Sequence, residues 1–456
     1  MNVTAVLLAA GHGTRMKSDL PKVLHPLCGK PMLWHVLEAL KSAATEKPVV
    51  IVGHGAEDVR NYVGDSAECV LQEPQMGTGH AAMQAEALLR GKTDYVIVTY
   101  ADMPLLRGET FQQLLETQRS NPGPLSLLTV IADDPRGFGR IVRKADGTVE
   151  AIVEEYVATP QQREIRELNV GAYCFKADWL WDALHRIEKN PKKGEYYLTD
   201  VVELAVRDNL PVQAMVHDDF IETIGINTRV HLSEAEVALR ARINREHMLN
   251  GVSMMDPAST YIEVDVEIGR DTTIMPNTYI HGNTEIGEGN VIGPNTIIRN
   301  SKIGHGCKVL ASVLDGAILE DDVDMGPFER LRSGAHLKSH VHMGNFGEVK
   351  DSILHEGVKM GHFSYIGNAN IGARTNIGAG TITANYDGEK KNPTEIGEDV
   401  FIGSDTMLVA PLKLGDGART GAGAVVTKNV PEDTLVVGMP ARAIRKLERK
   451  PKKANH

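Results

Sequence analysis

Isoleucine recurs at every sixth position in one stretch of this chain. The run comprises Ile262, Ile268, Ile274, Ile280, Ile286, Ile292 and Ile298. An α-helix repeats near every 3.6 residues and a single strand every two, so neither accounts for a period of six. A coil of three short strands does, because each hexad supplies one side of a triangular prism and its branched residue points to the axis. The stretch therefore predicts a parallel β-helix.

The six-residue pattern continues further along the chain. The register slips between Ile298 and Ile303 and returns downstream at Leu354, Met360, Ile366, Ile396, Ile402, Leu408 and Leu414. We therefore expect the prism to extend from about residue 252 to 440. Its interruptions, at Asp324–Asn345 and Asn385–Thr394, predict loops that leave the prism, where functional residues are often found.

Glycines follow several of these isoleucines and are expected at the corners of the prism. The pairs are Ile268-Gly269, Ile286-Gly287, Ile292-Gly293 and Ile303-Gly304. A residue without a Cβ atom tolerates a positive φ angle, which tight corners often require.

Strand and helix patterns alternate in the N-terminal half. We expect strands at Val3–Leu8, Val49–Val52, Cys69–Leu71, Tyr95–Tyr100 and Leu125–Val130, and helices from Pro31, Ala81 and Glu109. This βαβ rhythm predicts a largely parallel sheet with helices on both faces. Val230–Met248 has the pattern of an amphipathic linking helix. The predicted domains are 1–228, a linker helix at 229–250, and a β-helix at 251–456 whose basic tail from Arg442 is expected to be solvated.

Composition restricts the classes of function. The 456 residues include 49 Lys+Arg and 60 Asp+Glu, a net charge of -11 that argues against nucleic-acid or anionic-membrane binding. Small anionic substrates need only local cations. The four cysteines are scattered without a CxxC pair, which favours a reducing, cytoplasmic location. No basic leader precedes the first strand, and no segment approaches the ~18 apolar residues of a membrane span.

Candidate chemistry follows the predicted strands, since ligands of such sheets bind beyond the strands' carboxyl ends. The Gly11 loop is not a dinucleotide fingerprint, because Met16 takes the third glycine position, and Gly29-Lys30 is followed by a proline unlike a phosphate-binding Walker loop. The loop is either a tight turn or, together with Arg15 and Lys22, a cradle for a triphosphate.

Two further strand ends carry polar residues. In the segment 72–80, Gln72 could meet a base edge with both donor and acceptor, while Thr78 could equally cap a helix. Asp102 ends the central strand as a turn residue or as a ligand of Mg²⁺, which needs only one or two protein ligands.

Motifs throughout the chain are similar to those of one family. LAAGHGTRM, DLPKVLH, MGTGHA, YADMPL, GEYYLTD and GINTR resemble the uridylyltransferase half of the bifunctional bacterial N-acetylglucosamine-1-phosphate enzymes (GlmU-type). RLRSG, GNFGEVK, GHFSYIGNANIGARTNIGAGTITANYDG and FIGSDTMLVAP resemble their acetyltransferase half. The resemblance implies a sugar-nucleotidyltransferase α/β (Rossmann-like) domain followed by a left-handed parallel β-helix of hexapeptide repeats. It also implies a homotrimer that makes UDP-N-acetylglucosamine for the bacterial cell wall and lipopolysaccharide.

For the N-terminal half, the resemblance implies uridylyl transfer from UTP to N-acetylglucosamine 1-phosphate with release of pyrophosphate. Arg15 and Lys22 would act on the phosphates, and Asp102 with Asn227 would hold Mg²⁺. Residues implied to bind the sugar nucleotide are Leu8, Ala9, Ala10, Gly11, Lys22, Gln72, Gly77, Thr78, Tyr100, Ala101, Asp102, Gly139, Glu154, Asn169 and Asn227.

For the C-terminal half, the resemblance implies acetyl transfer from acetyl-CoA to glucosamine 1-phosphate. His362 would be the general base, although a histidine on a prism turn is otherwise most often just solvated. The sugar phosphate would be bound by Arg332, Lys350, Tyr365 and Asn376, and acetyl-CoA by Ala379, Asn385, Tyr386, Ser404 and Ala422.

Several positions depart from the family pattern. Ala101 replaces a usual glycine, Glu329 a small residue, and Gly347 a valine; Tyr156, Asp351 and Met439 also differ. Two other functions remain open from the residues alone. One is a single-function sugar-1-phosphate nucleotidyltransferase with a regulatory or assembly prism, and the other is a non-enzymatic scaffold.

Overall fold

The computed structural model describes residues 1–191 and 193–447, which divide into two compact units. Met1–Leu239 form the first unit, and the second begins at Arg240. The division falls within α9 (Arg229–Leu249), the helix expected at Val230–Met248. Among the described residues, no helix combines the length and apolar character that a membrane span requires.

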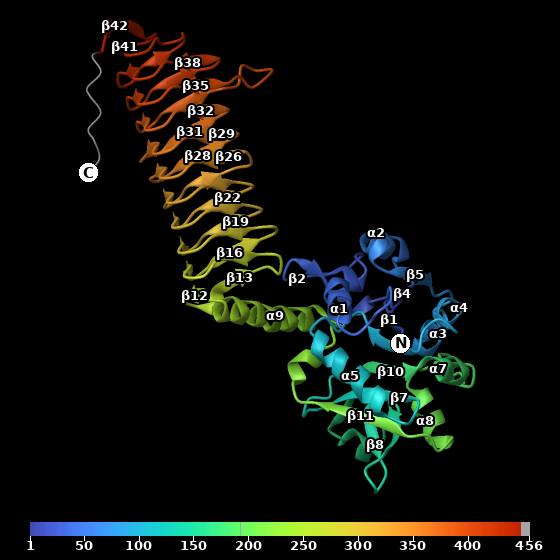
Figure 1. The fold of residues 1–456 in the computed structure, drawn as a ribbon. Helices are drawn as coiled ribbons and strands as arrows, with labels where there is room; N and C mark the ends of the chain where they lie inside the picture. Colours follow the sequence, from blue (N-terminus) through green and yellow to red (C-terminus); the bar gives the residue numbers. More distant parts are fainter. Residues whose placement is uncertain (192, 448–456) are drawn as a thin grey trace. The chain divides into compact units, whose positions relative to one another are not determined.

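The first unit is built on a mixed sheet with the strand order β11-β7-β10-β6-β1-β4-β5. Neighbouring strands are parallel except at β10, which is antiparallel to β6 and β7 (Figure 1). A hairpin of β8 and β9 extends from β10. Its strands are β1 (Val3–Leu8), β4 (Val49–Val52), β5 (Glu68–Leu71), β6 (Tyr95–Tyr100), β7 (Leu125–Ile131), β8 (Arg140–Arg143), β9 (Val149–Val153), β10 (Glu167–Lys176) and β11 (Val212–His217).

Helices and short turns connect these strands and match most of the expected elements. The helices are α1 (Met32–Leu40), α2 (Ala56–Val63), α3 (Thr78–Met83), α4 (Glu86–Leu89), α5 (Gly108–Ser120), α6 (Pro160–Arg163), α7 (Ala177–Leu184) and α8 (Asp200–Arg207). Short 3₁₀ turns are η1 (Thr14–Met16), η2 (Lys22–Leu24), η3 (Gly64–Ser66) and η4 (Phe220–Thr223), and β2 (Pro26–Leu27) pairs with β3 (Lys30–Pro31). The helix expected from Ala81 already begins at Thr78.

The central strand β1 contributes side chains to the hydrophobic cores on both faces of the sheet. Its alternating side chains place Val3, Ala5 and Leu7 in one buried cluster and Val6 and Leu8 in the other. All six of its residues are buried, as expected for a central strand covered on both faces.

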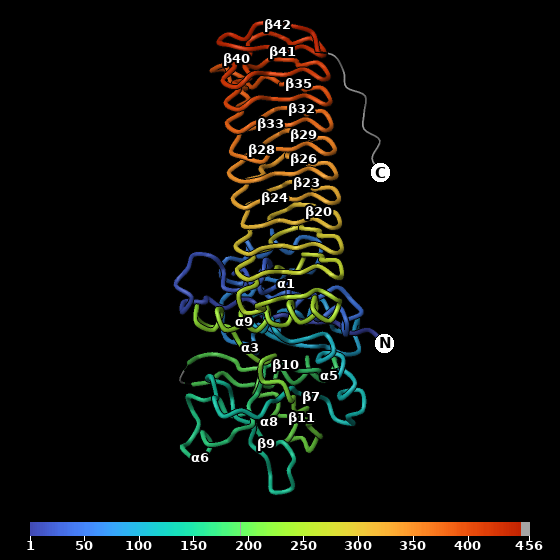
Figure 2. The backbone as a smooth tube through the Cα atoms, turned by 90° about the vertical axis from the view of Figure 1, so that its left-hand side faces the viewer, coloured from blue at the N-terminus to red at the C-terminus, as the bar shows by residue number. Residues whose placement is uncertain are grey.

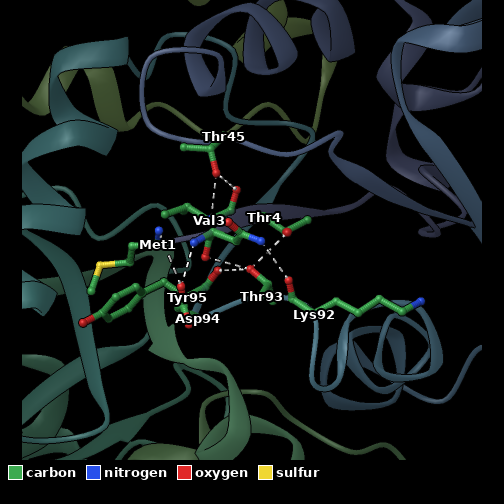
Figure 3. Close-up of polar contacts among 9 residues, drawn as sticks. Met1, Val3, Thr4, Thr45, Lys92, Thr93, Asp94 and Tyr95 are labelled. Atoms are coloured by element: carbon green, nitrogen blue, oxygen red, sulfur yellow. Dashed lines mark hydrogen bonds and ion pairs between the residues drawn. The ribbon is translucent and has the colours of Figure 1, made fainter.

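Hydrogen bonds anchor the start of β1 to the loops beside it (Figure 3). The Val3 N–H donates to Thr45 Oγ1 at 2.9 Å, and Thr4 Oγ1 lies 3.1 Å from Thr93 Oγ1. Thr93 Oγ1 also donates to the Asn2 carbonyl at 3.0 Å. The strand that ends at the Gly11 loop is therefore tied down at its other end.

The second unit is the parallel β-helix expected from the hexad pattern, with the left hand that the family resemblance implies. Over the described residues its strands form three sheets, and Figure 2 shows the coils stacked as parallel turns. The first sheet contains β12 (Ser253–Met254), β15 (Thr273–Ile274), β18 (Val291–Ile292), β21 (Lys308–Val309), β24 (Asp324–Met325), β27 (His342–Met343), β30 (Lys359–Met360), β33 (Asn376–Ile377), β36 (Phe401–Ile402), β39 (Arg419–Thr420), β41 (Thr434–Val437) and β42 (Arg442–Lys446).

The other two sheets complete the prism. The second contains β13 (Thr260–Ile262), β16 (Thr278–His281), β19 (Ile297–Arg299), β22 (Val313–Asp315), β25 (Arg330–Leu331), β28 (Gly347–Lys350), β31 (Ser364–Gly367), β34 (Ile382–Ala384), β37 (Met407–Val409) and β40 (Val425–Val426). The third contains β14 (Glu267–Ile268), β17 (Glu285–Ile286), β20 (Lys302–Ile303), β23 (Ile318–Leu319), β26 (Ala335–Leu337), β29 (Ser352–Leu354), β32 (Ala369–Ile371), β35 (Thr394–Ile396) and β38 (Leu412–Leu414).

The periodic aliphatic residues form the axis of the prism. Ile274, Ile280, Ile292 and Ile298 are fully buried, and each pairs in register with the equivalent residue one coil away. The coils differ in length while this pairing persists, since Ile371 pairs with Ile396 across a longer coil than the one that joins Ile280 to Ile298.

The explanation offered for the corner glycines is wrong for three of the four. Of these glycines only Gly293 has a positive φ angle. Gly269, Gly287 and Gly304 are required by close stacking instead. A Cβ atom on Gly269 would lie 2.7 Å from the carbonyl of Gly287, and one on Gly287 would lie 2.6 Å from the carbonyl oxygen of Gly304.

The expected loops had different outcomes. Asp324–Asn345 does not leave the prism, because β24, β25, β26 and β27 all lie within it. Asn385–Thr394 does separate β34 from β35, as expected. The tail expected to be solvated from Arg442 is exposed, but Arg442–Lys446 forms β42, antiparallel to β41. The rest of the predicted tail, 448–456, lies outside the described residues.

Candidate active sites

A cavity of about 460 Å³ lies beyond the carboxyl ends of β1 and β6. Its lining includes many of the residues expected to bind a sugar nucleotide: Leu8, Ala9, Ala10, Gly11, Lys22, Gln72, Gly77, Thr78, Tyr100 and Asp102. These residues come from four separate segments of the chain. Ala101 is different, because it is fully buried in the core on one face of the sheet.

Two cations and two oxygen acceptors converge beside this cavity. The Lys22 ammonium donates to the Asp102 carboxylate and, at 2.9 Å, to Asn227 Oδ1. Arg15 Nη2 donates to the same Asn227 oxygen at 2.8 Å. The Ile226 N–H donates to the Asp102 carbonyl at 2.9 Å, which brings the backbone before Asn227 to the end of β6.

The Gln72 side chain is buried in the wall of the cavity. Its Nε2 donates to the Gly77 carbonyl at 2.9 Å. Gly77 has a φ angle of 93°, and a Cβ atom there would lie 2.5 Å from the Tyr196 carbonyl oxygen. Thr78 does not cap α3, because Gly77 occupies that position; its hydroxyl instead accepts from the Leu198 N–H at 3.0 Å. The segments around 77 and 197 are therefore held together.

Half-buried polar groups cluster around Glu154, which was expected at the sugar. Glu154 Oε1 accepts from the Thr199 hydroxyl at 3.2 Å. Burial raises the pKa of Glu154, and the Thr199 hydroxyl and Lys193 only partly oppose it. Asp200, which follows Thr199 in the chain, has a pKa raised to about 6, first by burial and then by the charges of Glu203 and Glu154. Burial also raises the pKa of the Tyr100 hydroxyl.

The remaining expected sugar-site residues lie on β10 and beside it. The Asn169 N–H donates to the Gly139 carbonyl at 2.9 Å, and Asn169 Nδ2 donates to Tyr173 Oη at 2.7 Å. A Cβ atom on Gly171 would lie 2.4 Å from the Tyr100 ring. The pairing of β10 with β7 is irregular between Asn169 and Tyr173.

Sequence reasoning missed several residues of this first site. His12, Val23, Gln75, Ala81 and Glu195 also line the cavity. Gln75 Nε2 donates to the Ala10 carbonyl at 2.7 Å, and Glu195 lies within GEYYLTD, a motif already associated with the family. Their place in matched motifs was the available signal, but no motif specifies which of its side chains faces the ligand.

The residues expected at the acetyl site lie on two regions of the prism. At one corner, the turns that contain His362, Ala379, Ser404 and Ala422 stack on one another. The Gly380 N–H donates to the Phe363 carbonyl at 2.7 Å, the Asp405 N–H to the Ala379 carbonyl at 2.6 Å, and the Gly423 N–H to the Ser404 carbonyl at 2.8 Å. Three of the expected acetyl-CoA residues therefore follow His362 in a column.

Cationic residues gather on the sheet next to this corner. Arg332 Nη1 donates to Glu348 Oε1 at 2.9 Å, and Lys350 lies 3.5 Å from Asp351. Lys350 also contacts Lys391, and this contact, followed by the positive charge of Lys350, lowers the pKa of Lys391. Lys391 was not among the expected residues, because it lies in the excursion between β34 and β35, where the hexad pattern is lost.

The other expected residues surround the same sheet. A Cβ atom on Gly367 would lie 2.5 Å from Tyr365 Oη and 2.7 Å from Asn385 Nδ2, so both side chains lie over that glycine. Tyr386 is exposed and donates from Oη to the Gly388 carbonyl at 2.6 Å. Asn376 begins β33, on the far side of the His362 corner from Tyr365.

Comparison with known proteins covers both units. A MobA-like NTP transferase domain matches residues 5–167, and bacterial transferase hexapeptide repeats match residues 265–300 and 393–428. The bifunctional protein GlmU of Geobacillus thermodenitrificans is 48% identical over 97% of this chain and 96% of its own length. That of Geobacillus sp. is 46% identical over the same shares. The GlmU protein of Streptococcus agalactiae is 43% identical over 100% of this chain and 99% of its own. With such similarity across nearly the whole length of both proteins, the chain belongs to the GlmU family of bifunctional proteins.

Proposed function

We propose that the two units make UDP-N-acetylglucosamine in two steps. The prism acetylates glucosamine 1-phosphate with acetyl-CoA, and the α/β unit then transfers the uridylyl group of UTP to the product. The main support is that Arg15, Lys22, Asp102 and Asn227 converge beside a cavity lined by two glycine-containing loops. Cations and hard oxygen donors at a nucleotide-sized cavity are suited to phosphoryl chemistry.

Uridylyl transfer requires little covalent help from the protein. A phosphate oxygen of N-acetylglucosamine 1-phosphate attacks the α-phosphorus of UTP, and the bond to the pyrophosphate leaving group breaks. Lys22 and Arg15 would balance the negative charge on the phosphates. Gln72 and the Gly77 backbone would bind the uracil, and Glu154 and Asn169 the sugar hydroxyls. The burial of Glu154 favours strong hydrogen bonding there.

The donor set beside the cavity suits Mg²⁺. The Asp102 carboxylate and the Asn227 amide oxygen both accept from one ammonium group, so the two oxygens already converge. Mg²⁺ prefers such oxygen ligands and keeps substrate phosphates in its shell. When bound there, it would neutralise charge on the phosphate oxygens.

Acetyl transfer needs a base, because the substrate amine is protonated at neutral pH. His362 would remove a proton as the nitrogen attacks the thioester carbonyl, and the CoA thiolate would leave. Arg332, Lys350 and Lys391 would bind the phosphate, together with Tyr365 and Asn376. Ala379, Ser404 and Ala422 continue the His362 corner as a column and would bind acetyl-CoA with Asn385 and Tyr386.

The assembly and boundaries are also proposals. A homotrimer formed through prism faces would place residues of neighbouring copies around each acetyl site. The functional division would follow 1–228, 229–250 and 251–456. The four cysteines form no disulfide, which suits a cytoplasmic location.

A coupled assay tests this function. Glucosamine 1-phosphate, acetyl-CoA, UTP and Mg²⁺ are supplied together, and released CoA and pyrophosphate are measured separately. Both products are expected. Pyrophosphate release that requires added N-acetylglucosamine 1-phosphate, without CoA release, would instead support the single-function alternative. Release of neither would support the scaffold.

A further inference from the structure

One inner corner of the prism is lined by a column of hydroxyl side chains. Successive coils place Thr260, Thr278, Thr296 and Ser312 in register below residue 329, and Ser364, Thr381 and Thr406 above residue 347. These side chains are buried, and many bond the backbone of their own turn. For example, Thr278 Oγ1 donates to the Met275 carbonyl at 2.7 Å.

Glu329 and Gly347 interrupt this column on adjacent coils. The register of β25 with β28 places them side by side. The Glu329 side chain extends into the space above Gly347: a Cβ atom on Gly347 would lie 2.5 Å from both Glu329 Oε2 and the Met360 methyl. The long Glu329 side chain beside Gly347, which has no side chain, thus fills the volume that two small hydroxyl side chains fill elsewhere in the column.

The Glu329 carboxyl group lies in a site that disfavours charge. The residue is 2% exposed, and among the described residues neither of its oxygens has a hydrogen-bond partner. The Gly347 N–H faces it without bonding geometry and only partly offsets burial, which raises the Glu329 pKa to about 7. The charged residues on and beside β25 and on the adjoining strands β22 and β28 occupy the positions whose side chains point out of the prism. They are Asp315, Arg330, Arg332, Glu348 and Lys350. From the adjoining sheet, the apolar Met360 methyl borders the same space above Gly347.

The two interrupted coils carry part of the proposed acetyl site. Arg332 follows Glu329 on the same coil, and its N–H donates to the Val349 carbonyl at 2.9 Å. Its guanidinium donates to Glu348, and Lys350 ends the same strand as Glu348. Outside the corner, the rings of Phe328 and Phe346 stack at 5.3 Å. Glu329 is therefore buried between the two coils that carry the proposed phosphate-binding cations.

We propose that Glu329 is a positioning residue for acetyl transfer, held uncharged within the prism in the space left by Gly347, and that loss of its proton displaces Arg332 relative to Lys350. The proton passes to solvent, and the carboxylate then draws its strand towards water. The inference rests on the proposed acetyl-transfer function and adds a proton-dependent affinity for glucosamine 1-phosphate.

The test compares three full-length proteins: the natural chain, Glu329→Gln, and the exchange Glu329→Ala with Gly347→Val. The KM for glucosamine 1-phosphate is measured from pH 6 to pH 8.5. In the natural chain it is expected to rise severalfold more than in either variant, while kcat follows one profile in all three. His362 is common to all three proteins, so its contribution cancels. Uridylyl transfer should be the same in each and serves as the internal control.

A second measurement reports the proton directly. The infrared difference spectrum of the natural chain minus Glu329→Gln should contain a carboxylic-acid carbonyl band at pH 6 that gives way to carboxylate bands at pH 8.5. Carboxylate bands at both pH values, or the natural pH dependence of KM in the exchange variant, would overturn the proposal. If the natural chain releases no CoA, the acetyl-transfer function fails, while the infrared bands still decide the state of Glu329.

Discussion

Asn227 accepts a hydrogen bond from Lys22 at 2.9 Å, although 205 residues separate the two in the sequence. The same amide oxygen accepts from Arg15, and the same ammonium donates to Asp102. Four side chains thus form one connected group. Substitutions within such a group are not additive, because each removed partner changes the position and charge balance of the others.

Asp102→Ala is expected to abolish uridylyl transfer and leave acetyl transfer unchanged. Asp102 supplies the carboxylate of the proposed Mg²⁺ site, and the substitution leaves two cations beside it without their counter-charge. Pyrophosphate and CoA release are measured on the same preparation. Equal loss of both activities in a folded variant would contradict the assignment.

Lys22→Ala is expected to lower the kcat of uridylyl transfer about 10²- to 10³-fold, as for loss of one preorganised group that stabilises transition-state charge. Arg15→Ala should have a smaller effect, because the Arg15 side chain is exposed. Single-turnover rates with saturating UTP check both. A double variant should lose less than the product of the two single effects, since the side chains share Asn227; a full product would argue against a connected group.

His362→Ala is expected to lower acetyl transfer about a hundredfold or more, the usual contribution of a general base. Uridylyl transfer serves as the control and should not change. CoA release is followed with a thiol reagent. An acetyl-transfer rate equal to that of the natural chain would eliminate His362 as the base.

Lys391→Ala is expected to raise the KM for glucosamine 1-phosphate about tenfold with little change in kcat. Two lysine side chains in contact repel each other until an anion lies between them, and removing one of them removes a charged hydrogen bond to that anion. Lys390→Ala is the matched control on the same exposed segment. If both variants raise KM equally, a general electrostatic effect explains the result and Lys391 is not a specific ligand.

The stability of the prism should depend on pH through Glu329. The unfolded chain releases this proton above the ordinary pKa of 4.5, whereas the folded chain retains it to about pH 7. The free energy of unfolding should therefore fall by about 3 kcal/mol as pH rises from 4.5 to 7 and level off above. The Glu329→Ala, Gly347→Val exchange should remove this dependence.

The tryptophans make that measurement specific. Trp34, Trp179 and Trp181 all lie in the first unit. Urea unfolding followed by circular dichroism should include the pH-dependent transition of the prism, while tryptophan fluorescence should report a transition common to both proteins. An unchanged pH dependence in the exchange variant would show that another group is responsible.

Much of the fold could be predicted because its signals are periodic. The isoleucine hexads specify the axis of the prism, and the apolar runs of β1, β4 and β6 match their strand limits. The structural reason why a particular residue stands at a given position was less predictable. A glycine that allows positive φ and one that admits a neighbouring coil look identical in sequence, as Gly293 and Gly287 show.

For the candidate sites too, the motifs predicted the general location but not the role of each residue. Matched motifs brought many of the expected nucleotide-binding residues to one cavity, yet Gln75 and Glu195 were missed because motif membership says nothing about side-chain direction. Lys391 reaches Lys350 only through a segment outside the hexad pattern. Glu329 and Gly347 were seen as two separate departures, and only the pairing of coils shows that they share one volume.

The unequal coil lengths of the prism have a consequence for how such proteins diversify. Ile371 and Ile396 remain paired although the chain between them includes the segment that carries Tyr386 and Lys391. A connection between two strands can thus change in length while the paired strands of the coils on either side keep their register. The segment between β34 and β35 can therefore vary in length and sequence without disturbing the paired coils that carry Arg332 and Lys350.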